Sequence, residues 1–117
     1  DLTNSRIRNY KRMETRRIVF KIGVIYETKR ETLAEIPQLI RKIIESIAGT
    51  KFDRSHFASY GSYSLDFETV YYVLSGDYNI YMDIQQSINL RIFEEFVTRG
   101  IGFAYPTQQV FLQNEKK

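Results

Sequence analysis

The sequence predicts an α+β domain whose elements follow the order strand, helix, strand, strand, helix, strand. Two observations carry this prediction. Short stretches with the period-two alternation of strands are interleaved with two longer stretches that repeat apolar residues every three or four positions. The order βαββαβ is the ferredoxin-like arrangement. Right-handed crossovers then place two helices on one face of a four-stranded antiparallel sheet and leave the other face free.

The first strand is predicted over residues 17–26, where β-branched and aromatic residues alternate with period two. One face carries Ile18, Phe20, Ile22 and Val24, and the other carries Val19, Lys21 and Gly23. Because one face is apolar and the other is mixed, we expect this strand to be half buried.

A helix is predicted to follow, because Thr28 and Glu31 have capping-box spacing and Thr32 and Glu35 repeat it one turn later. The expected buried stripe comprises Leu33, Ile36, Ile40, Ile43, Ile44 and Ile47, with Arg41, Lys42 and Glu45 facing water. Gly49 is the expected stop.

A proline inside this helix predicts an irregularity. Pro37 removes one backbone hydrogen bond and crowds the preceding turn. Either the helix kinks there or its first turn is set apart from the rest, and we expect a bend near Glu35 or Ile36.

Residues 52–72 predict two antiparallel strands joined by a short turn at Gly61 and Ser62. The second of these strands alternates strictly between two faces. One face carries Leu65, Phe67, Thr69, Tyr71 and Val73, and the other carries Asp66, Glu68, Val70 and Tyr72.

Asp77 is predicted to cap a second helix that runs to Arg99 and ends at Gly100 in the left-handed conformation. The expected buried stripe comprises Tyr81, Ile84, Ile88, Ile92 and Phe96, flanked by Met82, Leu90, Phe93 and Val97. Glu95 and Arg99 lie four apart, in the favourable order for an ion pair.

The last strand is predicted to begin near Phe103 and, after an interruption at Pro106, to resume over residues 109–112. Proline cannot donate to a β-ladder, so we expect Pro106 at a sheet edge or at a bend.

The composition is that of one folded domain. The chain has 117 residues, of which 43% are hydrophobic and 15% aromatic, enough for a single core. It contains no cysteine, which excludes disulfides, thiolate metal sites and cysteine nucleophiles. No apolar run approaches the roughly 20 residues that a membrane helix needs. Because the chain begins with Asp1 and has no secretory leader, it would be either an excised fragment or a processed product, and we expect a fragment of a longer protein.

Residues suited to catalysis are sparse. His56 is the only histidine, and the adjacent Ser55 would point to the opposite face of a strand, so we expect a structural hydrogen bond there rather than proton transfer. Asp66 and Glu68 lie two apart on one strand face, a spacing that allows them to hold a hard cation or to act as an acid/base pair. The other interpretation is that they form the outward face of a half-buried strand. No glycine-rich phosphate loop is present. We predict no catalytic residue, no cofactor, no metal site and no enzyme activity.

Basic residues crowd the start of the chain. They are Arg6, Arg8, Lys11, Arg12, Arg16 and Arg17, against only Asp1 and Glu14. This basic arm would meet an anionic partner, or it would protect a solvated strand edge from pairing with other chains.

Aromatic residues on the predicted sheet permit a second hypothesis. The ferredoxin-like fold is also that of the RNA-recognition module, whose strand aromatics stack on bases. That module needs a basic and aromatic third strand, whereas residues 64–70 place Asp66 and Glu68 where phosphates would approach. A stand-alone binding module for RNA or a small regulatory ligand is therefore the alternative function.

Seven stretches, taken in order, resemble the cytosolic C-terminal α/β domain of the small-conductance mechanosensitive channel (MscS) family. They are residues 4–10, 20–28, 33–44, 52–57, 65–73, 77–90 and 101–109. The resemblance implies three segments: residues 1–16 as the end of a preceding β-domain or its connecting strand, residues 17–113 as the ferredoxin-like domain, and residues 114–117 as a polar tail.

The resemblance also implies a role without catalysis. The parent would be a homo-heptameric cell-membrane channel that opens under tension to release ions and solutes in osmotic shock. This fragment, which would neither span the membrane nor conduct, would form a vestibule wall on the cytoplasmic side, beside the parent's own β-domain and membrane helices and without a nucleic-acid partner. Val110, Phe111 and Leu112 would contribute inter-subunit contacts. The basic arm would face the β-domain or the vestibule.

Overall fold

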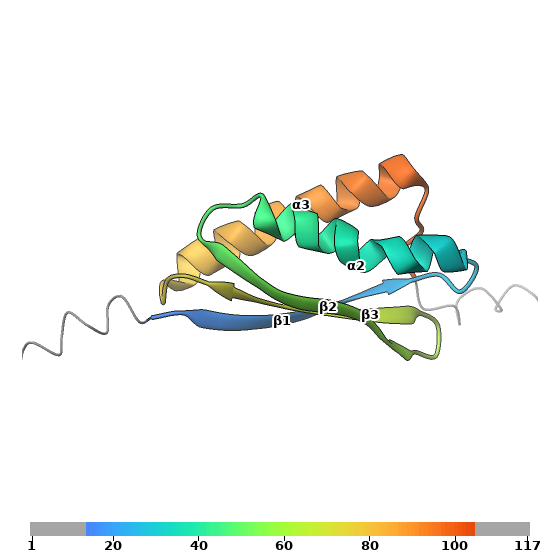
Figure 1. Ribbon diagram of the computed structural model, residues 1–117, viewed down its shortest axis with the longest axis horizontal. Coiled ribbons are helices and arrows are strands. Elements are labelled where there is room, and N and C mark those ends of the chain that lie inside the picture. Colours follow the sequence, from blue (N-terminus) through green and yellow to red (C-terminus); the bar gives the residue numbers. More distant parts are fainter. Residues whose placement is uncertain (1–13, 105–117) are drawn as a thin grey trace, which may run out of the picture.

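The structure is a computed structural model that describes residues 14–104. Three antiparallel strands form a sheet, and two helices cover one of its faces (Figure 1). The elements are β1 (Arg16–Val24), α2 (Arg30–Glu45), β2 (Thr50–Tyr60), β3 (Leu65–Val73) and α3 (Tyr78–Arg99). The strand order is β1-β3-β2, so β3 is central. The predicted α+β class is confirmed.

The predicted fourth strand is present in the described residues only as a single bridge. Val24 and Phe103 form an isolated antiparallel bridge. The Ile25 amide donates to the Gly102 carbonyl at 3.1 Å, and the Ala104 amide donates to the Gly23 carbonyl at 3.0 Å. Pro106 and residues 109–112, on which the rest of that prediction depends, lie outside the described residues. The sheet over residues 14–104 therefore has three strands rather than four.

Pairing within the sheet confirms the predicted strand faces. Ile18 pairs with Tyr71 and lies in the core on the side of the helices. Val19 pairs with Val70 on the opposite side, which neither α2 nor α3 covers (Figure 1). β2 contains two register shifts, between Phe52 and Arg54 and between Phe57 and Ser59. Simple alternation did not predict these β-bulges, because each inserts one extra residue into the strand.

The start of α2 is not the predicted capping box. Lys29 occupies the N-cap position and makes no side-chain cap hydrogen bond. The Thr28 hydroxyl instead donates to the Ile25 carbonyl at 2.6 Å. The capping prediction is therefore wrong, because Thr28 stabilises the turn that leaves β1. The helix runs from Arg30 without interruption through Pro37, so its first turn is not set apart.

The end of α2 comes at Glu45, before the predicted stop. The Ser46 amide and hydroxyl both donate to the Ile43 carbonyl, at 3.2 Å and 2.7 Å, and these bonds close the last turn. Gly49 leads into β2 with a φ of 84°. An L side chain would be strained in that conformation, so the glycine is used to enter the strand rather than to cap the helix.

Both ends of α3 follow the predictions. The Asp77 side chain accepts a hydrogen bond from the Asn79 amide at 2.8 Å. Gly100 adopts the left-handed conformation with a φ of 74°. Glu95 and Arg99 form an ion pair at 3.2 Å. The local signals for this helix are therefore confirmed.

The core lies between the helices and the sheet, and every element contributes to it. Fully buried members include Val24, Ile36, Ile40, Ile44, Phe67, Tyr71, Ile88 and Phe96. Phe57 stacks on Phe67 with ring centroids 5.2 Å apart, and Phe96 stacks on Phe103 at 4.8 Å. Leu39, which the predicted stripe of α2 omits, is also buried. The sheet and its helix layer, held together by this core, position the exposed side chains on the two outer faces of the domain.

Candidate interaction surfaces

The sheet separates Ser55 from His56, whereas it brings His56 beside Glu68 on one face. Ser55 is buried on the helix side, where its hydroxyl lies 2.9 Å from the Thr69 hydroxyl. His56 is exposed and pairs in register with Glu68 on the open side. The predicted divergence of Ser55 and His56 is confirmed. Within residues 14–104, no group of three histidine, cysteine or acidic side chains could hold a metal ion.

A buried polar network links the sheet to α3. The Tyr71 hydroxyl donates to Gln85 Oε1 at 2.7 Å, and Gln85 Nε2 donates to Asn89 Oδ1 at 2.9 Å. Burial raises the pKa of the Tyr71 phenol well above its ordinary value, and the neighbouring Tyr81 raises it further. Tyr71 therefore stays protonated and serves as a hydrogen-bond donor that positions α3.

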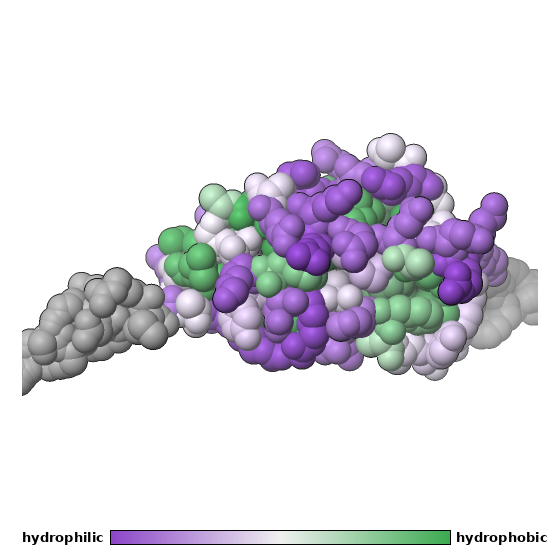
Figure 2. Space-filling view, in the orientation of Figure 1, coloured by the Kyte–Doolittle hydropathy of each residue, from purple (hydrophilic) through white to green (hydrophobic). Residues whose placement is uncertain are grey.

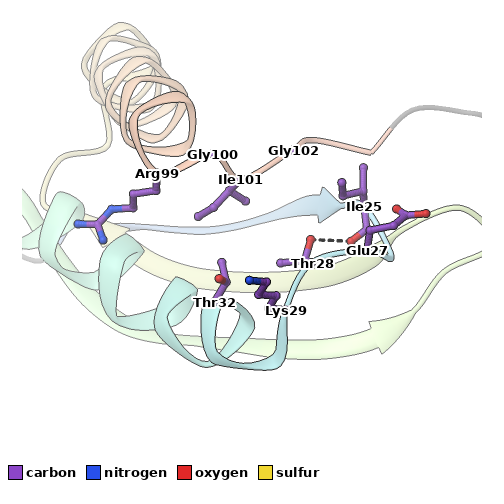
Figure 3. Close-up of a pocket in the computed structure, with 9 residues that line it drawn as sticks. All are labelled: Ile25, Glu27, Thr28, Lys29, Thr32, Arg99, Gly100, Ile101 and Gly102. Carbon is purple, nitrogen blue, oxygen red and sulfur yellow. Dashed lines mark hydrogen bonds between the residues drawn. The ribbon is translucent and has the colours of Figure 1, made fainter.

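A shallow polar cavity of about 320 Å³ lies where the loop after β1 meets the end of α3 (Figure 3). Two cationic side chains, Lys29 and Arg99, line it together with Glu27, Thr28 and the backbone of residues 100–102. The Thr28 hydroxyl is occupied with the Ile25 carbonyl. None of the lining residues is a histidine or a cysteine, so the lining has neither the most common general base nor a thiol nucleophile.

Arg16 is the first residue of β1, and its side chain contacts residues at the start of α3. Its guanidinium carbon lies 5.9 Å and 5.6 Å from the ring centroids of Tyr78 and Tyr81, and Nη2 donates to the Gly76 carbonyl at 2.9 Å. Its Nε is buried and has no hydrogen-bond partner among the described residues. We call this contact the Arg16 clasp. Sequence reasoning missed it, because nothing local connects Arg16 with residues sixty or more positions away.

The open face of the sheet is divided by charge. The register aligns the rows Arg17-Tyr72-Lys51, Val19-Val70-Arg54, Lys21-Glu68-His56 and Gly23-Asp66-Ser59. The first two rows, which we call the basic sheet patch, contain three cations and no carboxylate. Among the described residues, Arg54 pairs with Asp53 at 2.9 Å, whereas Arg17 and Lys51 form no ion pair. Both carboxylates of the central strand lie in the other two rows.

The outward side of α3 is apolar. Leu90, Phe93 and Val97, which we call the α3 stripe, are 57%, 56% and 63% exposed. They follow the spacing i, i+3, i+7 and therefore share one side of the helix. Figure 2 shows, on the face that it presents, hydrophobic surface broken into separate patches by hydrophilic side chains. The sequence signal for the stripe was present, because these positions lie outside the predicted buried set.

Of the remaining residues of the predicted sites, two belong to the described part of the chain. Arg6, Arg8, Lys11 and Arg12 of the basic arm lie outside the described residues, as do Val110, Phe111 and Leu112. Arg16 and Arg17 are described, and they point in different directions: the former into the Arg16 clasp, the latter onto the open sheet face. Over residues 14–104, neither helix is long and apolar enough to cross a membrane.

Comparison with known proteins relates this chain to mechanosensitive ion channels. A family model described as "Mechanosensitive ion channel MscS, C-terminal" matches residues 18–103. These residues run from the third residue of β1 to the bridge at Phe103, so the match includes most of β1 and all of α2, β2, β3 and α3.

Similar proteins come from a bacterium and an archaeon. An uncharacterized MscS family protein of Aquifex aeolicus is 36% identical over 120 residues, covering 100% of this chain and 33% of that protein. The small-conductance mechanosensitive channel MscMJ of Methanocaldococcus jannaschii is 34% identical over 116 residues, covering 98% and 33%. The large-conductance channel MscMJLR of the same archaeon is 31% identical over 99 residues, covering 80% and 27%. The chain spans about a third or less of the length of these curated relatives.

Proposed function

The chain belongs to the MscS family of mechanosensitive ion channels, and from this premise we propose that it is the cytosolic vestibule domain of a tension-gated channel. The match over residues 18–103 carries the proposal, because it includes α2, β2, β3, α3 and most of β1. Two of the relatives are named as mechanosensitive channels, and the chain aligns with 33% or less of each of them. The parent would release ions and solutes in osmotic shock, and this domain would neither span the membrane nor conduct.

The parent is proposed to be a homo-oligomer in the cell membrane, specifically a heptamer. This domain is proposed to lie on the cytoplasmic side. Such a domain needs a rigid fold, surfaces that close a ring and wall charges that bias which ions pass. The charged open face of the sheet and the apolar outer side of α3 support that role. No enzymatic activity is proposed.

The ferredoxin-like sheet is proposed to be complete in the parent. The antiparallel bridge between Val24 and Phe103 supports this, because it starts the chain along the unpaired edge of β1 in the direction that a fourth strand would take. Val110, Phe111 and Leu112 are proposed to contact a neighbouring subunit. The basic arm, residues 6–17, is proposed to face the preceding β-domain or the vestibule.

Patch-clamp recording of the full-length parent tests the proposed function. The parent is expressed in a host that lacks its own mechanosensitive channels, and suction ramps are applied to excised membrane patches. Currents that rise with tension and disappear when the helices preceding this domain are deleted are the expected result. A parent that gives no current and is soluble would contradict the proposal and would favour the binding module.

A further inference from the structure

We propose that the α3 stripe of one copy packs against the basic sheet patch of the next copy, in a head-to-tail contact between neighbouring subunits. The proposal rests on the proposed homo-oligomeric channel, which holds several copies of this domain close together. It goes beyond that proposal by assigning two surfaces within residues 14–104 to each other.

The α3 stripe is apolar without serving the core. Its three side chains remain more than half exposed, although Phe93 also stacks beside Phe103 with centroids 6.3 Å apart. The same side of the helix also carries polar residues. Asp83 and Gln86 lie seven and four positions before Leu90, and Glu94 lies four positions after it. This side of α3 therefore combines an apolar centre with two exposed carboxylates and no Lys or Arg.

The basic sheet patch has the opposite character. Val19 is 42% exposed at its centre, and Tyr72 is half buried beside it. The cations of the patch, Arg17, Lys51 and Arg54, are all exposed. An apolar centre flanked by Arg17, Lys51 and the Arg54–Asp53 ion pair complements an apolar centre flanked by two carboxylates, both in burial and in charge.

Geometry selects the head-to-tail arrangement. The α3 stripe belongs to the helix layer, and the basic sheet patch lies on the open side of the sheet (Figure 1). One copy therefore presents the two surfaces on opposite sides and cannot pair them within itself. A symmetric contact would bring Asp83 and Glu94 of one copy against those of another, or cations against cations, which like-charge repulsion disfavours. A repeated head-to-tail contact closes a ring when its rotation allows.

Cysteine cross-linking of the full-length parent in its membrane tests this contact. The described chain contains no cysteine, and cysteines elsewhere in the parent are replaced first. Val97→Cys and Val19→Cys are combined in one chain and treated with a flexible bismaleimide. The expected result is a ladder of covalent multimers larger than a dimer, which neither single variant gives.

Two results would overturn the contact. Val97→Cys combined with Glu35→Cys, an exposed position on α2, is the matched control. Equal ladders from this control and from the test pair would show random collision. Either no ladder from the test pair, or dimers from Val97→Cys alone, would exclude the head-to-tail arrangement.

Charge reversal provides an independent readout. With the same cysteine pair, Asp83→Lys together with Glu94→Lys is expected to lower the multimer yield about tenfold, because like charges then face each other. Arg17→Glu together with Lys51→Glu is expected to lower it similarly, and the combination of all four is expected to restore it. Glu35→Lys should have no effect, and absence of the restoration would contradict the proposed pairing.

Tension recordings on the same variants separate this contact from the proposed function. Tension-gated currents without a ladder would leave the channel proposal standing and exclude the contact. A ladder without currents would support the contact and contradict the channel.

Discussion

The two helices lie on the same face of the same sheet, yet they differ in what their outward sides contain. α2 buries Ile36, Ile40 and Ile44 and turns charged residues to water, including the Arg41–Glu45 ion pair at 3.0 Å. α3 also buries one stripe, but Leu90 and Val97 remain exposed on its outer side. Packing in the core therefore explains where the apolar residues Ile36, Ile40 and Ile44 lie on α2. It does not explain the exposed apolar residues Leu90 and Val97 on α3. The apolar residues that folding does not require are the ones to examine for contacts with other chains.

The largest expected difference is between the two sides of α3. Phe96→Ala should lower the free energy of unfolding by about 3–5 kcal/mol, because it empties a fully buried site beside Phe103. Leu90→Ala should change it by no more than about 0.5 kcal/mol, because Leu90 is mostly exposed. Urea unfolding of this chain measures both. Equal losses would show that the outer side of α3 belongs to the core, and the comparison with α2 would fail.

The next effect concerns the hydrogen bond that holds α3 to the sheet. Tyr71→Phe leaves Gln85 Oε1 without its donor and should cost about 1–3 kcal/mol near neutral pH. Burial raises the pKa of Tyr71 in the folded state, so the stability that this group contributes is fully present below its unfolded pKa of roughly 10. That contribution is lost as the pH rises further.

The alkaline part of this prediction is measured by unfolding at increasing pH. The unfolding free energy of the unsubstituted chain should fall more steeply above pH 10 or so than that of Tyr71→Phe. Tyr63→Phe, at an exposed ring, is the control and should keep the steep fall. Parallel curves for all three chains would mean that Tyr71 does not govern the alkaline loss.

The smallest effect separates the starts of the two helices. Asp77→Ala removes the side-chain cap of α3 and should cost about 1 kcal/mol. Lys29→Ala should cost almost nothing, because Lys29 makes no cap hydrogen bond. Lys29→Asp should stabilise the chain by about 0.5–1 kcal/mol, since it adds the missing acceptor. A loss of stability with Lys29→Asp would mean that the start of α2 has another requirement.

The same contrast explains which parts of the fold could be read from the sequence. Both ends of α3 were predictable, because Asp77 and Gly100 act on backbone groups within a few residues of themselves. The start of α2 was not, because Thr28 could cap the helix or close the turn after β1, and only the folded loop decides between them. The alternation of β1 and β3 was predictable, whereas the bulges of β2 leave no periodic signal.

The candidate surfaces were only partly predictable, for a related reason. Arg17 and Val19 share a face by period two, so half of the basic sheet patch is visible in the sequence. Its other half, Lys51 and Arg54, arrives through a register that only the sheet establishes. The family resemblance is confirmed by the match over residues 18–103. The roles given to residues 110–112 and to the basic arm stay predictions.

The bridge between Val24 and Phe103 determines how a mechanical load would cross this domain. The described chain enters at the beginning of β1 and leaves beside its far end, where Gly102 and Ala104 are hydrogen bonded to Ile25 and Gly23 (Figure 1). A pull on residues 14 and 104 would therefore run lengthwise along a single strand. It would strain the bridge in shear, because antiparallel hydrogen bonds lie across the strand direction. Because Phe103 also stacks on Phe96 of α3, a load that strains the bridge would reach this helix as well.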